Sequence, residues 1–285
     1  YVYPMNVKNL EQSFNPRLAV PNFESYLRIS KEKAKLAEKK LTGKTDISYG
    51  DSKLQTLDVF YKDYKDNLPI HIFIHGGYWR ALDKSYHTHM AVPFFEKEIC
   101  FFNINYELCP KVKLTEIREQ IIKAIVWIYE NAYKFNANNK NIVLSGHSAG
   151  AHLASLMLNV DWKKYGLNDK YFKGIALISG IFDTEIVTNL NVNKEIGLSL
   201  EEAIKNNLFK LKPLYVVPTI ISYGKNEPTL WKEQSYNYMN YLNLLGFNCK
   251  KIVCENDNHF SLIETLADNN KSIVKEIINL SLTKQ

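Results

Sequence analysis

The feature that most restricts the fold of this 285-residue chain is an alternation, from Thr56 onward, of short apolar runs with longer amphipathic stretches. Short runs rich in β-branched and aromatic residues predict strands, whereas apolar residues that recur every three or four positions predict helices. The predicted strands cover residues 56–61, 70–75, 100–106, 141–146, 174–180, 219–224 and 249–255. Strands that alternate with helices indicate the α/β class, with a mostly parallel twisted sheet and helices on both faces.

The helical pattern is clearest at residues 114–128 and at residues 230–245, where Gly246 marks the end. We expect one domain over residues 1–285, with two segments outside the alternation. The N-terminal extension, residues 1–55, is predicted to be helical from about Phe23 and to contribute to the pocket. The insertion at residues 182–213 is predicted to form a small helical lid. Ligands of open α/β sheets bind beyond the carboxyl ends of the strands, so these segments are candidates to decide substrate choice.

The net charge of +6 does not point to a nucleic-acid partner. Only four of the 36 basic residues are arginine, and the lysines are scattered among glutamates and asparagines. Nucleic-acid-binding proteins instead gather their basic residues in a patch. No apolar run approaches the roughly 18 residues of a membrane span. We therefore expect a small-molecule substrate and neither nucleic acid nor membrane as a partner; a homodimer is one option for the assembly.

The four cysteines, Cys100, Cys109, Cys249 and Cys254, form no CxxC pair. Three of them lie in or beside strand-like apolar runs, which favours reduced and mostly buried thiols. The first residues also lack the basic and apolar segments of a signal peptide. These features predict a cytoplasmic protein.

The sequence GHSAG at residues 146–150 matches the pattern Gly-x-Ser-x-Gly directly after a predicted strand and before a predicted helix. In such a turn the serine adopts a strained backbone conformation, and small neighbours let the strand and the helix approach closely. Ser148 is therefore the candidate nucleophile. The alternative is a serine that only caps the following helix.

A serine hydroxyl is a weak nucleophile near neutral pH, so it needs a base and a third group that orients the base. Of the seven histidines, His259 is the one that follows Ser148 by far enough to lie on another loop. Glu227, just beyond a predicted strand, is the candidate acid. Asp183, after the preceding strand, is its main rival, and two acidic residues just before His259 lie too close along the chain to reach the far ring nitrogen easily.

The sequence HGGYW at residues 75–79 supplies candidates for an oxyanion hole. Backbone N–H groups aimed at the developing negative charge each contribute about 10²- to 10³-fold in rate. Gly76 and Gly77 allow the loop to turn such donors toward the serine, and the N–H of Ala149 adds another.

We expect different roles for His75, Tyr78 and Trp79, the other side chains of this loop. His75 is predicted to brace the loop. Tyr78 and Trp79 are predicted to wall a substrate pocket, with packing in the core as the alternative.

No cofactor and no metal are expected. The sequence HTH at residues 87–89 and the pair His147 and His152 have no acidic or cysteine ligands at metal spacing. Neither glycine motif carries the Lys-Ser/Thr of a P-loop or the three glycines of a dinucleotide fingerprint.

In order, the motifs HGGYWR, NINYELCP, GHSAG, GKNE and NHF resemble those of the α/β-hydrolase superfamily, specifically its bacterial esterase and kynurenine formamidase (arylformamidase) group. Tyr-Trp after HGG is typical of the formamidase-like branch, and the leading segment EQSFNPRLAVPNFESY is similar too. The resemblance covers nearly the whole chain. It implies a triad and oxyanion donors at the following positions: Ser148, Glu227 and His259, with Gly76, Gly77 and Ala149. One departure is that many formamidases carry aspartate where Glu227 stands.

The resemblance implies an α/β-hydrolase fold and a serine hydrolase that removes a small acyl group from an aryl formamide or ester. N-formyl-L-kynurenine, cleaved to kynurenine and formate, is the leading substrate. A short-chain carboxylesterase and, from another class, a non-catalytic binding protein of the same fold are the alternatives.

Overall fold

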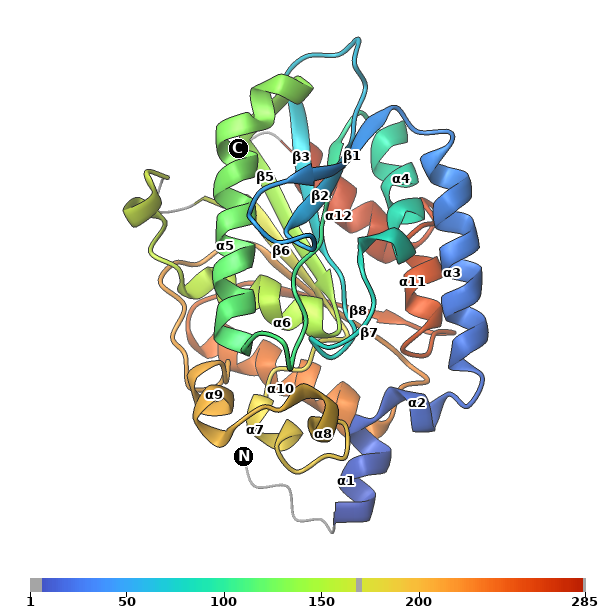
Figure 1. The fold of residues 1–285 in the computed structure, drawn as a ribbon, viewed down its shortest axis with the longest axis vertical. Helices are drawn as coiled ribbons and strands as arrows, with labels where there is room; N and C mark the ends of the chain where they lie inside the picture. Colours follow the sequence, from blue (N-terminus) through green and yellow to red (C-terminus); the bar gives the residue numbers. More distant parts are fainter. Residues whose placement is uncertain (1–6, 168–170, 284–285) are drawn as a thin grey trace.

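The computed structural model describes residues 7–167 and 171–283, and they are organised around one eight-stranded sheet (Figure 1). The strands are β1 (Gly43–Ser48), β2 (Thr56–Phe60), β3 (Leu68–Ile74), β4 (Cys100–Ile104), β5 (Ala137–His147), β6 (Gly174–Ile178), β7 (Thr219–Gly224) and β8 (Cys249–Cys254). Their order is β1-β2-β4-β3-β5-β6-β7-β8. The β1–β2 and β2–β4 pairs are antiparallel and the others are parallel. All seven predicted strands are confirmed.

The eighth strand, β1, is not predicted by the sequence pattern, and the assignment of residues 1–55 as an extension needs correction there. Its sequence GKTDIS is mostly solvent-exposed and its pairing with β2 is interrupted between Lys44 and Ile47. An edge strand that is polar on both faces and bulged shows no alternation of apolar and polar residues. The pattern that identifies the other strands is therefore absent.

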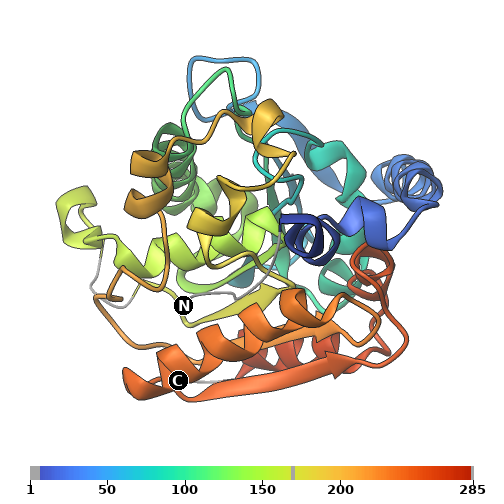
Figure 2. The same ribbon diagram turned by 90° about the horizontal axis from the view of Figure 1, so that it is seen from below.

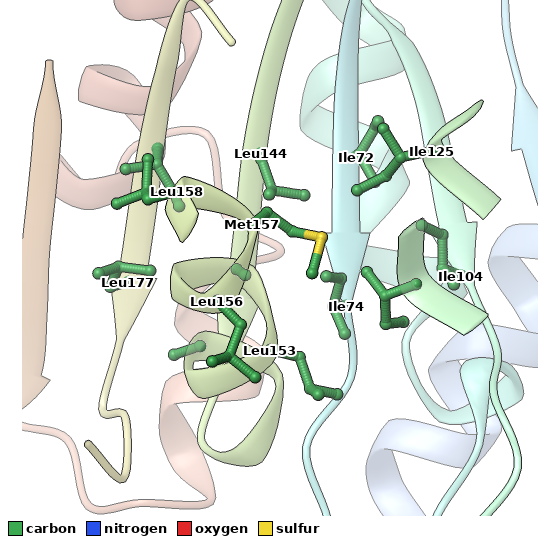
Figure 3. Packing of buried hydrophobic residues seen from close by; sticks show 14 of the residues in the cluster. Ile72, Ile74, Ile104, Ile125, Leu144, Leu153, Leu156, Met157, Leu158 and Leu177 are labelled. Carbon is green, nitrogen blue, oxygen red and sulfur yellow. The ribbon is translucent and has the colours of Figure 1, made fainter. Parts of the chain in front are cut away.

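Side chains of the strands point alternately into two cores, one on each face of the sheet. Ile72 and Ile74 of β3 belong to the larger core, whereas Phe73 between them belongs to the smaller one. Figure 3 shows aliphatic side chains of the larger core packed between the strands and the covering helices. Helices α5 (Leu114–Asn131), α6 (Ala149–Leu156) and α10 (Thr229–Leu244) contribute to the larger core, and α4 (Ala91–Glu96), α11 (Ser261–Thr265) and α12 (Ser272–Leu282) to the smaller core.

The predicted helices at residues 114–128 and 230–245 correspond to α5 and α10, and the predicted N-terminal helix is α3 (Phe23–Glu38). Five shorter helices gather at the end of the sheet where the parallel strands terminate (Figures 1 and 2). They are α1 (Val7–Phe14), α2 (Pro16–Ala19), α7 (Thr184–Val187), α8 (Asn193–Ile196) and α9 (Leu200–Lys205). The last three form the helical insertion expected at residues 182–213.

All four cysteines are free and three are buried, as predicted. In the described residues, no helix combines the length and the apolar character needed to cross a membrane.

Candidate active site

The carboxyl ends of neighbouring parallel strands place the candidate residues at one edge of the sheet. Ser148 follows β5, Glu227 lies three residues after β7 and His259 lies five residues after β8. On the other side of β5, the HGGYW loop follows β3, which pairs directly with β5. Because these strands run in the same direction within one sheet, residues far apart in sequence meet beyond their carboxyl ends.

Ser148 has the backbone conformation that a sharp strand-to-helix turn imposes. Its φ and ψ are 57° and −123°, a region that non-glycine residues rarely occupy. A Cβ atom on Gly146 would lie 2.1 Å from the carbonyl oxygen of Gly150, so the turn cannot close with a larger residue there. The Ser148 N–H donates to the carbonyl of Ile178 at the end of β6 (2.9 Å), which fixes the turn against the sheet.

Ser148, His259 and Glu227 form one continuous hydrogen-bonded chain. The Ser148 hydroxyl lies 3.0 Å from Nε2 of His259, and Nδ1 of His259 lies 2.6 Å from Oε1 of Glu227. All three side chains are buried. With Nδ1–H donating to the carboxylate, Nε2 is free to accept the serine proton, which is the tautomer a general base needs.

Two residues that no sequence motif indicated, Ser179 and Trp231, hold the acid in place. The Ser179 hydroxyl donates to Oε1 of Glu227 and lies 2.9 Å from Nδ1 of His259, and the indole N–H of Trp231 donates to the Ser179 oxygen (2.9 Å). The second oxygen of Glu227 accepts the backbone N–H of Gly224 (2.8 Å). Ser179 comes directly after β6, between the nucleophile strand and the acid strand, so its place at a strand end was the available signal.

The rival acids are occupied elsewhere. Asp183 caps α7 by accepting the backbone N–H of Glu185 (3.1 Å) and also accepts from the amide of Asn207 (2.8 Å). Asp257 accepts from the hydroxyls of Ser261 and Thr265 (2.8 and 2.7 Å). The carboxylate that contacts His259 is that of Glu227.

The HGGYW loop approaches the serine through its glycines. A Cβ on Gly76 would lie 2.9 Å from Cβ of Ser148, and Gly77 has a φ of +114°. In the described parts of the chain, no acceptor pairs with the backbone N–H of Gly77 or of Ala149. Two unpaired donors that flank the nucleophile are what a developing oxyanion requires.

The two aromatic residues of the loop have different positions, and the prediction for Trp79 is wrong. Trp79 is fully buried in the larger core, where its ring meets that of His152 edge to face at 5.0 Å, and it does not border the cavity. Left-handed φ values at both Tyr78 and Trp79 turn the chain back on itself, so the tryptophan faces the core. Tyr78 does line the cavity, and its hydroxyl donates to the carbonyl of Phe14.

Two further histidines support the site. His75 stacks on Tyr106 at 4.2 Å, and its Nδ1–H donates to the carbonyl of Gly76 (2.8 Å), so it braces the loop. His147 lies with its ring 4.7 Å from that of His259. Burial and the neighbouring His259 ring hold the pKa of His147 well below its usual range, so His147 stays neutral beside the base.

A cavity of about 170 Å³ opens above Ser148 and His259. One wall belongs to the N-terminal segment, with Asn15, Pro16 and Arg17, and another to the insertion. Both segments predicted to lie outside the alternation therefore border the cavity. Its further lining residues include Leu27, Tyr78, Arg80, Leu82, Asn191, Val192, Glu195, Phe260 and Ile263.

The histidine pairs noted in the sequence do not come together as ligand sets. Nδ1 of His87 donates to the carbonyl of Asp83 (3.2 Å), and His89 lies beside Glu264 (3.2 Å). In residues 7–167 and 171–283, no three histidine, cysteine or acidic side chains are grouped as metal ligands.

Comparison with known proteins assigns the family. The model of the BD-FAE family matches residues 57–242. The chain belongs to the BD-FAE family. Two curated relatives are kynurenine formamidases: that of Salmo salar is 27% identical over 97% of both chains, and that of Drosophila melanogaster is 26% identical over 94% of this chain and 91% of its own.

Solved structures agree with the fold of this BD-FAE family member. A provisionally assigned thioesterase from Silicibacter sp. TM1040 superposes with a TM-score of 0.82 at 25% identity, over 94% of this chain and 98% of its own. Esterase B from Lactobacillus rhamnosis has a TM-score of 0.70 at 16% identity, over 94% of this chain and 96% of its own. The expected α/β-hydrolase fold is confirmed, and the chain is an α/β hydrolase of the kynurenine formamidase-like branch.

Proposed function

We propose that the protein is a serine hydrolase that cleaves N-formyl-L-kynurenine to kynurenine and formate, with Ser148 as nucleophile, His259 as base and Glu227 as the acid that orients it. The observation that carries the proposal is the hydrogen-bonded chain of these three side chains, of which Ser148 and His259 line a small cavity. The kynurenine formamidases that align with nearly the whole chain support the choice of substrate.

In this mechanism, the Ser148 oxygen attacks the formyl carbon while His259 Nε2 takes the hydroxyl proton. The carbonyl oxygen becomes an oxyanion that the N–H groups of Gly77 and Ala149 stabilise, in the loop geometry that Gly76 permits. The carbon–nitrogen bond then breaks and His259 gives its proton to the aniline nitrogen. Water attacks the formyl ester by the same route, releases formate and restores the serine.

The size of the cavity favours a small acyl group. Pockets for drug-sized ligands are typically about 300–1,000 Å³, whereas this cavity has about 170 Å³. A formyl group and one aromatic ring suit this space better than a long acyl chain. An anilide nitrogen also leaves more readily than an alkyl amine, because the ring delocalises its lone pair.

Turnover of N-formyl-L-kynurenine by the purified protein, compared with p-nitrophenyl acetate and butyrate, tests the proposal. We expect the formamide to be the best substrate by kcat/KM and butyrate the poorest. The variant Ser148→Ala should stay folded and lose about 10⁶-fold in activity, since triad residues act as a unit. Hydrolysis of the esters without the formamide would instead indicate a short-chain carboxylesterase.

A fluorophosphonate probe separates both enzymes from a binding protein of the same fold. It should label the wild-type protein and leave Ser148→Ala unlabelled. An unlabelled wild type, or retention of more than one per cent of activity by the variant, would contradict the assignment of the nucleophile.

We also propose a cytoplasmic location, which the four free thiols support.

A further inference from the structure

Arginine is rare in this protein and concentrated at the cavity. The chain has four arginines, and two of them, Arg17 and Arg80, line the cavity that contains Ser148. Arg17 comes from α2, and Arg80 directly follows the HGGYW loop. Two segments that are distant in sequence therefore bring guanidinium groups to one small space.

The charges of the lining residues do not cancel. Glu195 is the one carboxylate among them, and its Oε2 lies 2.6 Å from a terminal nitrogen of Arg80. Arg17 has no carboxylate partner among the described residues, and its guanidinium lies over the ring of Phe23 at 5.1 Å. The cavity thus carries two permanent positive charges and one negative charge.

The environment of Arg80 makes this excess charge costly. Its side chain is 11% exposed, and its Nε is buried without a hydrogen-bond partner in the described structure. Burial and the positive charge of Arg17 lower the pKa of Arg80. An anionic group placed between the two guanidinium groups would offset both the repulsion and the unpaired donor.

We propose that Arg17 and Arg80 bind a carboxylate on the leaving group of the substrate, so that the preferred substrates are aryl formamides with an anionic side arm. This inference rests on the proposed function for the identity of the bond that is cleaved. Glu195, with 59% of its side chain exposed, adds an acceptor for an ammonium group. A zwitterionic α-amino-acid tail presents both charges next to each other and fits this lining.

A matched pair of substrates isolates the carboxylate. N-formyl-L-kynurenine carries the amino-acid tail, whereas 2-formamidoacetophenone has the same aryl formamide with a neutral methyl group in its place. The ratio of their kcat/KM values cancels general damage to the site. In Arg17→Gln this ratio should fall about 10- to 100-fold, mostly through KM, because a hydrogen bond to a charged group is lost.

Arg28→Gln is the matched control, since Arg28 is exposed on α3 and outside the cavity lining. It removes the same charge and should leave the ratio within about twofold. Arg17→Lys should retain a larger ratio than Arg17→Gln. Arg80→Gln should also lower the ratio, and if that buried variant fails to fold, the exposed Arg17 carries the test.

The outcomes separate this inference from the proposed function. An unchanged ratio in Arg17→Gln, with N-formyl-L-kynurenine still hydrolysed, would overturn the role of the arginines and leave the reaction intact. If neither formamide is hydrolysed, phenyl acetate and 3-(3-acetoxyphenyl)propanoate replace them as a neutral and an anionic ester. If the ratio of kcat/KM for the anionic ester over the neutral ester fell in Arg17→Gln but not in Arg28→Gln, the role of the arginines in carboxylate binding would be supported even though the formamidase proposal had failed.

Discussion

The cavity has two sides that differ in how the protein builds them. On the sheet side, the serine, glutamate and histidine follow β5, β7 and β8 of the parallel part of the sheet. All three are buried and are joined by hydrogen bonds of 2.6–3.0 Å. On the helix side, the lining residues come from the N-terminal segment and from the insertion, and the charged ones, Arg17 and Glu195, are exposed. We propose that the sheet side cleaves the bond, and that Arg17 and Glu195 of the helix side, together with Arg80 after the HGGYW loop, select the substrate.

After the loss of the nucleophile itself, the largest expected effect tests the sheet side at its acid. Glu227→Gln keeps the size of the side chain but can present an amide N–H to Nδ1 of His259, which favours the wrong tautomer. We expect kcat to fall by up to about 10⁴-fold with the fold intact. Steady-state kinetics measure kcat, and a thermal melt checks that the variant is folded.

Asp183→Asn is the control for this acid, because Asp183 is also buried after a sheet strand but contacts α7 instead of the histidine. Its kcat should stay within about threefold of wild type. If Asp183→Asn were the crippling change and Glu227→Gln were mild, the acid would lie after β6 and the arrangement of the sheet side described above would be wrong.

The same difference between the two sides explains what the sequence can predict. Ser148, Glu227 and His259 follow strands with strong apolar patterns, and strand ends of a parallel sheet meet at one edge, so their meeting could be expected. Short helices such as α2 and α8, each four residues long, are too short for helical periodicity to appear. Arg17 and Arg80 meet at one cavity because of tertiary packing, and no local sequence pattern indicates that they do.

The sequence pattern did not predict strand β1, the buried position of Trp79 or the contact of Ser179 with Glu227, and each case has its own physical reason. β1 is polar and bulged at the sheet edge, so it lacks alternation. Trp79 turns into the core because two successive residues adopt left-handed φ values, which no pattern of HGGYW specifies. Ser179 is a small polar residue at a strand end, and only the position of Glu227 in space reveals its contact with the acid.

A smaller effect is expected from Ser179→Ala, which sharpens the description of the sheet side. The substitution removes one of the donors to Glu227 and leaves Trp231 N–H with only the backbone carbonyl of residue 179 at 3.2 Å. Because Ser179 positions the acid and does not border the cavity, kcat should fall about 10-fold while KM stays within twofold.

Ser155→Ala provides a matched control, since Ser155 is a fully buried serine that bonds the hydroxyl of Tyr238 (2.6 Å) away from the cavity. Loss of that hydrogen bond should lower the melting temperature comparably without changing kcat. Equal kcat values for the two variants would mean that Ser179 stabilises the fold without positioning the acid.

The smallest effect should come from the helix side, at a residue that joins its two walls. The buried carboxylate of Glu11 accepts the amide of Asn15 (2.9 Å) and the backbone N–H of Asn191 (2.8 Å), so it ties the N-terminal segment to the insertion. Glu11→Ala should let these walls separate and raise KM for N-formyl-L-kynurenine about 3- to 10-fold, since lost hydrogen bonds of about 1 kcal/mol each loosen the cavity. Because none of these contacts reaches the triad, kcat should stay within about twofold, and the exposed Glu24→Ala should change neither constant. A fall in kcat at constant KM would show that the walls also hold the reacting groups, and the division of the cavity into a side for chemistry and a side for recognition would have to be abandoned.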